Sequence, residues 1–140
     1  MGARRYGPTP TKGSRMFQRL LWLAVAGALG TLARYGVGVC LPRVEGGFPW
    51  ATLTVNCVGS FLFGCVWTLA DQRSVLPLDV RIAVLAGFLG GFTTFSAFAF
   101  ETVHFLRHEE YGSAVANVLA NNVLGILLFF VGYALCRNGT

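Results

Sequence analysis

Four long apolar stretches dominate this sequence and limit the folds open to it. A helix rises about 1.5 Å per residue, so about 20 apolar residues are needed to cross ~30 Å of hydrocarbon. The stretches are continuous, whereas the strands of a membrane β-barrel would alternate. With 54% hydrophobic and 12% charged residues, the chain is also unlike a soluble domain. We therefore predict an all-α membrane protein whose four transmembrane helices run over Leu20–Leu41, Trp50–Ala70, Ile82–Phe105 and Ala114–Cys136.

The N-terminal segment differs from the rest of the chain. Residues 1–15 contain four basic residues, three glycines and two prolines and have little apolar surface to bury, which predicts a disordered basic tail. Residues 16–140 form the predicted four-helix unit, and Met16 is an alternative translation start. A basic tail could bind anionic lipid headgroups or nucleic acid, but its charges form no dense patch, so a solvated tail without a partner is the favoured interpretation.

The basic residues in the connections predict an orientation. The short connections imply an up-down-up-down bundle with both termini on one side of the membrane. Lys and Arg outside the spans then divide as eight on the terminal side against two, Arg43 and Arg107, on the other. This excess favours termini in the cytoplasm of a multi-pass plasma-membrane protein. A start at Met16 would leave four against two, which allows either orientation.

Several classes of function are disfavoured by the residues present. The four cysteines have no C-x-x-C spacing and no histidines in metal-ligand register, so metal or redox chemistry at these residues is not expected. We predict that the chain is not an enzyme. Four short helices also enclose very little, so we expect a second subunit, most simply in a symmetric dimer.

Two residues that are charged at neutral pH lie within the predicted spans, where charge is costly and usually functional. Arg34 is a candidate positive charge at a pore mouth, although its long side chain could also snorkel to the headgroups. Glu101 is a candidate vestibule residue, a partner for a cation, or an ordinary charge near a helix end.

Polar residues follow one face of two spans. Thr52, Asn56, Ser60 and Gly64 recur at i, i+4 in the second span, and the fourth span contains Asn117, Asn121, Asn122 and Gly125. Hydroxyl and amide donors can replace the hydration of an anion and still release it. The alternative interpretation is hydrogen bonding between helices.

The middle of the third span predicts a break in the helix. Gly87-Phe88-Leu89-Gly90-Gly91-Phe92-Thr93-Thr94-Phe95-Ser96 combines glycines and hydroxyl residues that add little to a regular helix. Non-helical backbone at this depth must be buried in protein or line a cavity, and its carbonyls can bind a cation such as Na⁺. Phe95 and Phe98 follow on one helical face, and aromatic ring edges carry partial positive charge.

These motifs resemble the CrcB family, the Fluc fluoride channels of bacteria, over residues 20–136. The resemblance rests on Gly27-Ala28-Leu29-Gly30-Thr31-Leu32-Ala33-Arg34-Tyr35, on Thr52-Leu53-Thr54-Val55-Asn56-Cys57-Val58-Gly59-Ser60-Phe61, and above all on Gly90-Gly91-Phe92-Thr93-Thr94-Phe95-Ser96-Ala97-Phe98. It implies an antiparallel dual-topology dimer, two narrow fluoride pathways between the subunits, and a structural sodium ion held by backbone carbonyls at the dimer interface.

The resemblance also implies roles for individual residues. Fluoride-pathway residues would be Asn56, Phe95, Phe98, Thr52 and Asn121; pore-mouth charges Arg34 and Glu101; and carbonyl donors to sodium Gly90 and Thr93. The chain departs from the family at Ala97, where threonine is usual, and at Asn121, where serine is usual. The partner could be a second copy or a paired homologue.

The function implied is passive, fluoride-specific export that relieves toxicity. Two alternatives remain at the level of sequence. A small coupled exporter of the multidrug type also has four short helices, but it uses a carboxylate in its first span, where this chain has Arg34. A non-conducting membrane scaffold would use the polar stripes to join its helices.

Overall fold

The chain folds into an all-helical bundle with four spans long and apolar enough to cross a membrane. The computed structural model describes residues 12–42, 47–71 and 76–138. The first two spans are single helices, α1 (Lys12–Cys40) and α2 (Trp50–Asp71). The third comprises α3 (Leu78–Ile82), the π-helical η1 (Ala83–Leu89), α4 (Gly90–Phe92) and α5 (Phe95–Arg107). The fourth comprises α6 (Tyr111–Leu119), the π-helical η2 (Ala120–Leu124) and α7 (Gly125–Asn138).

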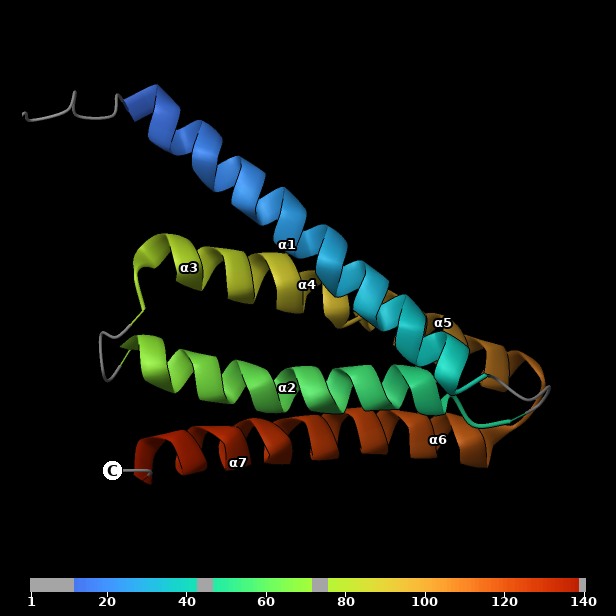
Figure 1. The fold of residues 1–140 in the computed structure, drawn as a ribbon. Coiled ribbons are helices and arrows are strands. Elements are labelled where there is room, and N and C mark those ends of the chain that lie inside the picture. Colours follow the sequence, from blue (N-terminus) through green and yellow to red (C-terminus); the bar gives the residue numbers. More distant parts are fainter. Residues whose placement is uncertain (1–11, 43–46, 72–75, 139–140) are drawn as a thin grey trace, which may run out of the picture.

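Successive spans run in opposite directions. The start of α1, the end of α2, the start of α3 and the end of α7 lie at one end of the bundle, on the left of Figure 1. The described ends of the chain are therefore on the same side, which confirms the predicted up-down-up-down arrangement. It also places Arg19 of α1 beside Asp79 of α3, where the two side chains form an exposed salt bridge.

The first helix is longer than the predicted span. It begins at Lys12, so residues 12–15, which we predicted as part of the disordered tail, are helical. That part of the prediction was wrong because the polar residues simply continue the helix beyond the apolar stretch. Residues 1–11 of the tail lie outside the described residues.

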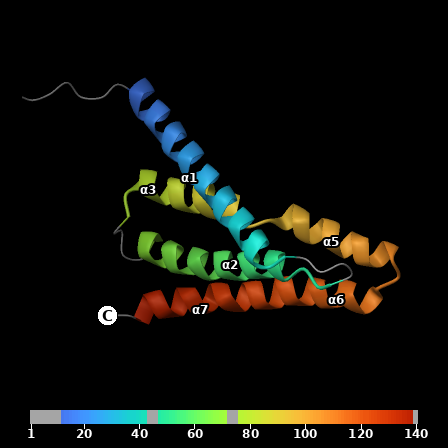
Figure 2. The same cartoon turned by 45° about the vertical axis from the view of Figure 1, so that its right-hand side comes forward.

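The second and fourth spans pack closely along their length through glycines. A Cβ at Gly64 would lie 2.1 Å from the carbonyl oxygen of Phe129, and a Cβ at Gly132 would lie 2.2 Å from that of Phe61. Without hydrophobic driving force inside a bilayer, such backbone approach supplies van der Waals contact between helices. The two spans accordingly lie side by side in both Figure 1 and Figure 2.

The first helix packs on the third span and diverges from the rest of the bundle toward its N-terminal end (Figure 1). Its contact again depends on glycines. A Cβ at Gly30 would lie 2.0 Å from the carbonyl oxygen of Phe88, and one at Gly91 would lie 2.5 Å from that of Gly27. Very little of the apolar stretch of α1 is buried within this chain.

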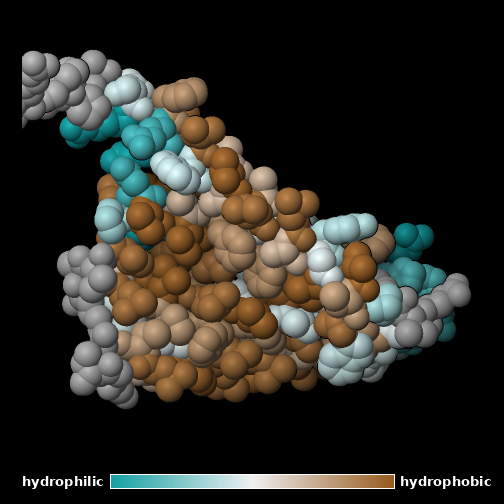
Figure 3. Space-filling model, viewed as in Figure 1, coloured by the Kyte–Doolittle hydropathy of each residue, from teal (hydrophilic) through white to brown (hydrophobic). Residues whose placement is uncertain are grey.

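The surface is the one expected for a protein in lipid. Apolar side chains cover the middle of the face in Figure 3, while hydrophilic residues gather at its two ends. Large exposed side chains include Leu29, Leu32, Phe95, Phe100, Ile126 and Phe130. Lipid or a second subunit can cover this apolar surface, whereas its exposure to water would be unfavourable.

The third span is broken, as predicted, and Figure 2 shows α5 displaced from the line of α3 and α4. The break is at Thr93 (φ −82°, ψ 159°) and Thr94 (φ −150°, ψ 108°), which are both extended. Gly90 and Gly91 are still helical. Gly91 and Gly87 instead allow α1 to approach the third span, so close helix packing, rather than the break itself, accounts for these two glycines.

Candidate functional site

Hydrogen bonds to one asparagine hold the extended segment in place. The backbone N–H of Thr94 donates to Asn56 Oδ1 at 2.8 Å, and Asn56 Nδ2 donates to the carbonyl oxygen of Thr94 at 3.2 Å. Buried peptide groups in lipid must be paired, and here an amide side chain of α2 pairs both polar groups of Thr94. The predicted polar face of the second span thus supports the break directly.

The same threonine begins the next helix. Thr94 Oγ1 accepts the N–H of Ala97 at 3.2 Å, which is the hydrogen bond of an ordinary helix N-cap. The N-terminus of α5, with its partial positive charge, therefore lies at mid-membrane beside the break. A threonine directly before an apolar run is a sequence signal for such a start, although our prediction gave Thr94 no separate role.

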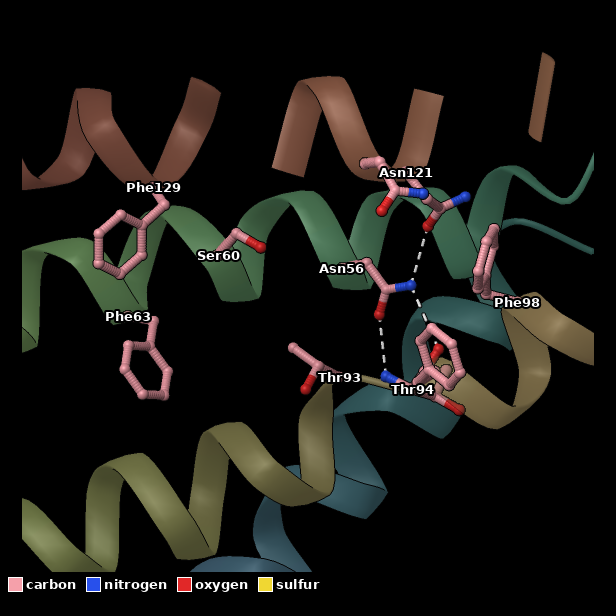
Figure 4. A pocket seen from close by; sticks show the side chains of 10 residues that line it. Asn56, Ser60, Phe63, Thr93, Thr94, Phe98, Asn121 and Phe129 are labelled. Carbon is pink, nitrogen blue, oxygen red and sulfur yellow. Dashed lines mark hydrogen bonds between the residues drawn. The ribbon is translucent and has the colours of Figure 1, made fainter. Parts of the chain in front are cut away.

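An open pocket of about 460 Å³ lies beside the break. Figure 4 shows its lining side chains converging from three spans, with the Asn56 amide at the centre. Donors and acceptors share the wall with aromatic rings, a combination suited to a small, partly dehydrated ion. The lining residues are Asn56, Ser60, Phe63, Thr93, Thr94, Phe95, Phe98, Asn121, Asn122 and Phe129.

The two predicted phenylalanines line this pocket and differ in exposure. Phe98 is buried, whereas Phe95 is 79% exposed within the single chain. Their ring centroids are 5.4 Å apart and the rings are tilted by 56°. A large apolar ring left so exposed at the mouth of a polar pocket needs covering by lipid or protein.

The fourth span contributes an amide to the same wall. Asn121 Oδ1 accepts from Asn56 Nδ2 at 2.9 Å, and Asn121 Nδ2 donates to Asn117 Oδ1, also at 2.9 Å. Asn117 is fully buried. Both interpretations of the polar stripes therefore apply, because the same amides line a pocket and join two helices.

A second, smaller pocket of about 240 Å³ shares Thr94 as a lining residue. Arg34, Thr52 and Ala97 line it. Thr52 Oγ1 donates to Glu101 Oε1 at 2.6 Å, and both of these residues are buried. The structure thus groups Thr52 with Arg34 and Glu101, apart from the pocket of Asn56, and it places Glu101 inside the chain.

The break also removes the helical partners of the carbonyls that precede it, including those of Gly90 and Thr93. In an uninterrupted helix Thr94 N–H would donate to Gly90 O and Ala97 N–H to Thr93 O. Here these donors bond Asn56 Oδ1 and Thr94 Oγ1 instead. The two predicted sodium ligands, Gly90 and Thr93, are thus among the carbonyls of residues 90–93 that lose their helical partners at the break. Thr93 O accepts from Arg34 Nη1 at 3.3 Å.

Several residues of the site were not singled out from the sequence. Phe63 and Phe129 line the pocket, and their ring centroids are 6.2 Å apart. They come from α2 and α7, and nothing in their local sequence distinguishes them from lipid-facing aromatics. Only the packing of the two helices brings them to the wall.

Comparison with known proteins identifies the relatives of this chain. Residues 21–133 match the family model described as CrcB-like protein, Camphor Resistance (CrcB). The chain belongs to the CrcB-like family. The match covers most of each of the four transmembrane segments. It includes the break at Thr93 and Thr94 and also Asn56, which forms both hydrogen bonds to Thr94.

Curated members of the CrcB-like family align over nearly their whole length. A protein of Nitrosococcus oceani named "Fluoride-specific ion channel FluC" is 45% identical over 123 residues, which are 87% of this chain and 98% of that protein. Proteins of the same name from Solidesulfovibrio magneticus and Thermus thermophilus are 43% and 44% identical, over 87% and 84% of this chain and 98% and 93% of theirs. With its four spans, this CrcB-like chain is a multi-pass protein of the cell membrane.

Proposed function

We propose that this protein is a passive, fluoride-specific ion channel that exports cytoplasmic fluoride. One observation carries the proposal: the pocket at the break combines the Asn56 amide with Phe95 and Phe98 at mid-membrane. Relatives named as fluoride-specific channels support the choice of ion. Amide donors and ring edges of partial positive charge favour an anion over a cation.

The driving force requires no coupled reaction. HF crosses membranes as a neutral molecule and ionises in the near-neutral cytoplasm, where fluoride is then trapped. With the interior negative, outward movement of one anion gains about 2.3 kcal/mol per 100 mV. A pathway alone therefore lowers the cytoplasmic concentration.

Fluoride efflux from proteoliposomes, followed with an ion-selective electrode, tests the proposal. Asn56→Asp replaces the donors by a negative charge, so we expect efflux to fall about 10- to 100-fold. Phe95→Ile removes a ring edge and should reduce efflux about tenfold. Phe100→Ile is the matched control, since Phe100 is an exposed phenylalanine of the same helix outside this pocket. Undiminished efflux in both test variants would contradict the proposal.

We further propose that the channel is a dimer, antiparallel and of dual topology, with two pathways between its subunits. The open pocket, the exposed ring of Phe95 and the sparsely buried α1 support this proposal, because each offers a surface that a second subunit can cover. The partner is a second copy or a paired homologue. Cysteine cross-linking of two tagged subunits tests the orientation. In an antiparallel dimer the tags of the linked subunits are accessible from opposite sides of the membrane.

A structural sodium ion at the subunit interface is the remaining proposal. Gly90 and Thr93 would supply carbonyl oxygens, since the break diverts their helical donors. A carbonyl oxygen has two lone pairs, so Thr93 can bind a cation and still accept from Arg34. We expect thermal stability in detergent to rise saturably with Na⁺ but not with N-methylglucamine. Equal stability in Na⁺ and in N-methylglucamine would contradict the proposed sodium site. It would not affect the proposal of fluoride transport.

The two alternative functions are not supported by the relatives, whose names describe channels. A coupled exporter would show saturable efflux that depends on a proton gradient. A scaffold would show no efflux at all. The same liposome assay, run with and without a pH gradient, separates the three.

A further inference from the structure

Side-chain amides beside the pocket form one continuous chain of hydrogen bonds across three spans, in part visible in Figure 4. Thr94 N–H donates to Asn56 Oδ1 at 2.8 Å, and Asn56 Nδ2 donates to Asn121 Oδ1 at 2.9 Å. Asn121 Nδ2 then donates to Asn117 Oδ1, and Asn117 Nδ2 to Thr102 Oγ1, each at 2.9 Å. All donors point in the same sense along the chain, so each bond polarises the next.

Backbone groups fix the direction of every amide in this chain. A backbone N–H only donates, so the Asn56 atom facing Thr94 N–H is its oxygen. A backbone carbonyl only accepts, so the Asn121 atom 3.1 Å from Asn117 O is nitrogen. By the same rule the Asn117 atom 3.4 Å from Phe98 O is nitrogen. No amide can be reversed without breaking a bond to the backbone.

This arrangement has a consequence for an anion at Asn56. Its Nδ2 donates both to Thr94 O and to Asn121 Oδ1, so both N–H groups already have acceptors. An anion that binds this nitrogen must displace one of the two acceptors. The Thr94 carbonyl belongs to backbone that Asn56 Oδ1 also holds, so the side-chain oxygen of Asn121 is the acceptor that has to move. The anion therefore competes with an amide carbonyl for the N–H group. It replaces the carbonyl oxygen only if it is the stronger hydrogen-bond acceptor.

Halides differ in this competition. Fluoride is the smallest and concentrates its charge most, so it is the strongest hydrogen-bond acceptor among them. Chloride is larger and accepts more weakly. Fluoride can thus displace an oxygen that already accepts from the donor, whereas chloride cannot. This holds only if the oxygen is held in position and cannot rotate away from the donor.

Asn117 prevents that movement. It is 0% exposed and is absent from the pocket wall, so it does not meet the ion. Its Oδ1 and its backbone oxygen both accept from Asn121 Nδ2, at 2.9 and 3.1 Å. Thr102 Oγ1 in turn accepts from Asn117 Nδ2 and restrains the amide from the other end.

We propose that Asn117 is a positioning residue for selectivity, which holds the Asn121 oxygen on the Asn56 donor so that only a strong acceptor displaces it. The proposal rests on the fluoride-channel function above. It differs from a purely structural role for Asn117, because it predicts a change in which anion passes rather than only in stability.

The test measures the fluoride-to-chloride permeability ratio in proteoliposomes for Asn117→Leu, Asn121→Leu and the double variant. Leucine is close in size to asparagine but has no acceptor. We expect each single change to lower the ratio about tenfold, the effect of one hydrogen bond. Because Asn117 acts through Asn121, the double variant should show no further fall.

Two outcomes would overturn the inference. The first is an unchanged ratio in Asn117→Leu despite a lower ratio in Asn121→Leu. The second is full addition of the two effects in the double variant. If the wild-type protein conducts fluoride and either outcome is found, the inference alone fails; if the wild type shows no fluoride efflux, the proposed function fails first.

Thr102→Val provides a milder variant should leucine at the buried position 117 prevent folding, as judged by size-exclusion chromatography. It keeps side-chain shape and removes the acceptor for Asn117 Nδ2, together with the hydrogen bond that Thr102 Oγ1 donates to Phe98 O within the same helix. We expect a two- to fivefold fall in the ratio, which disappears in the Asn121→Leu background. A ratio equal to that of wild type would again contradict the role of Asn117.

Discussion

At the scale of single residues, the most demanding feature is a carboxyl group placed at membrane depth. Glu101 is 8% exposed and accepts the Thr52 hydroxyl at 2.6 Å, the distance of a charge-assisted O–H···O bond. A group of this kind is costly to bury unless it is hydrogen-bonded. The second span therefore supplies a partner for the third span as well as pocket-lining groups.

Thr52→Val tests that partnership. Valine keeps the shape but removes the donor, so we expect the free energy of unfolding to fall by about 1.5–3 kcal/mol, the range for hydrogen bonds to charged groups. Thr52→Ser retains the hydroxyl and should lose less than about 1.5 kcal/mol. Unfolding in mixed micelles by SDS measures both, and equal losses in the two variants would count against the bond.

At the scale of elements, the break depends on close packing between the second span and Thr93. A Cβ at Gly59 would lie 2.2 Å from Thr93 Cγ2, far inside van der Waals contact. While the Thr93 methyl is present, the extended segment can keep its position only if residue 59 has no side chain. The packing of α2 thus controls the geometry at the end of α4.

Gly59→Ala should therefore shift the break and reduce fluoride efflux about tenfold or more, an overpacking effect of 1–3 kcal/mol. Thr93→Ser in the same chain deletes the Cγ2 methyl that clashes while keeping the hydroxyl that donates to Leu89 O at 2.9 Å. We expect the double variant to recover most of the efflux. Gly36→Ala, with nothing within 4 Å of the added Cβ, is the matched control. A double variant as impaired as Gly59→Ala would rule out this steric explanation.

At the scale of the whole molecule, insertion depends on charges at the two ends of the bundle. Among the described basic residues near helix ends, Arg15, Arg19, Arg81 and Arg137 belong to the ends of α1, α3 and α7 on the side of the chain ends, and Arg107 ends α5 on the other side. The four helices are otherwise similar in length and hydropathy. Orientation therefore depends on a small number of arginines and lysines rather than on the fold.

Removal of residues 1–15 should make the orientation mixed. The truncation lowers the charge division from eight against two to four against two. For a subunit that pairs with a homologue of opposite orientation, we expect a dual reporter at the C-terminus, active in the cytoplasm or outside it, to change from one dominant signal to comparable signals from both. A dual-topology homodimer would instead give comparable signals already in the full-length chain, so the same reporter also separates the two proposed partners. Restoring four lysines in an unrelated leader should restore the single orientation. An unchanged signal in the truncated chain would show that these charges do not set the topology.

The sequence by itself determined the class of this protein, its four spans and the presence of a break, because the length of an apolar stretch and the lack of helix-forming residues act locally. The family followed from the motif around Thr93 and Phe95. Only the tertiary structure decided which polar groups meet. It located the break at two threonines rather than at the glycines, grouped Thr52 with Glu101, and joined Asn56 to Asn117 through Asn121. Hydrogen-bond partners 38 to 65 residues apart depend on how the helices pack, and no local pattern encodes that.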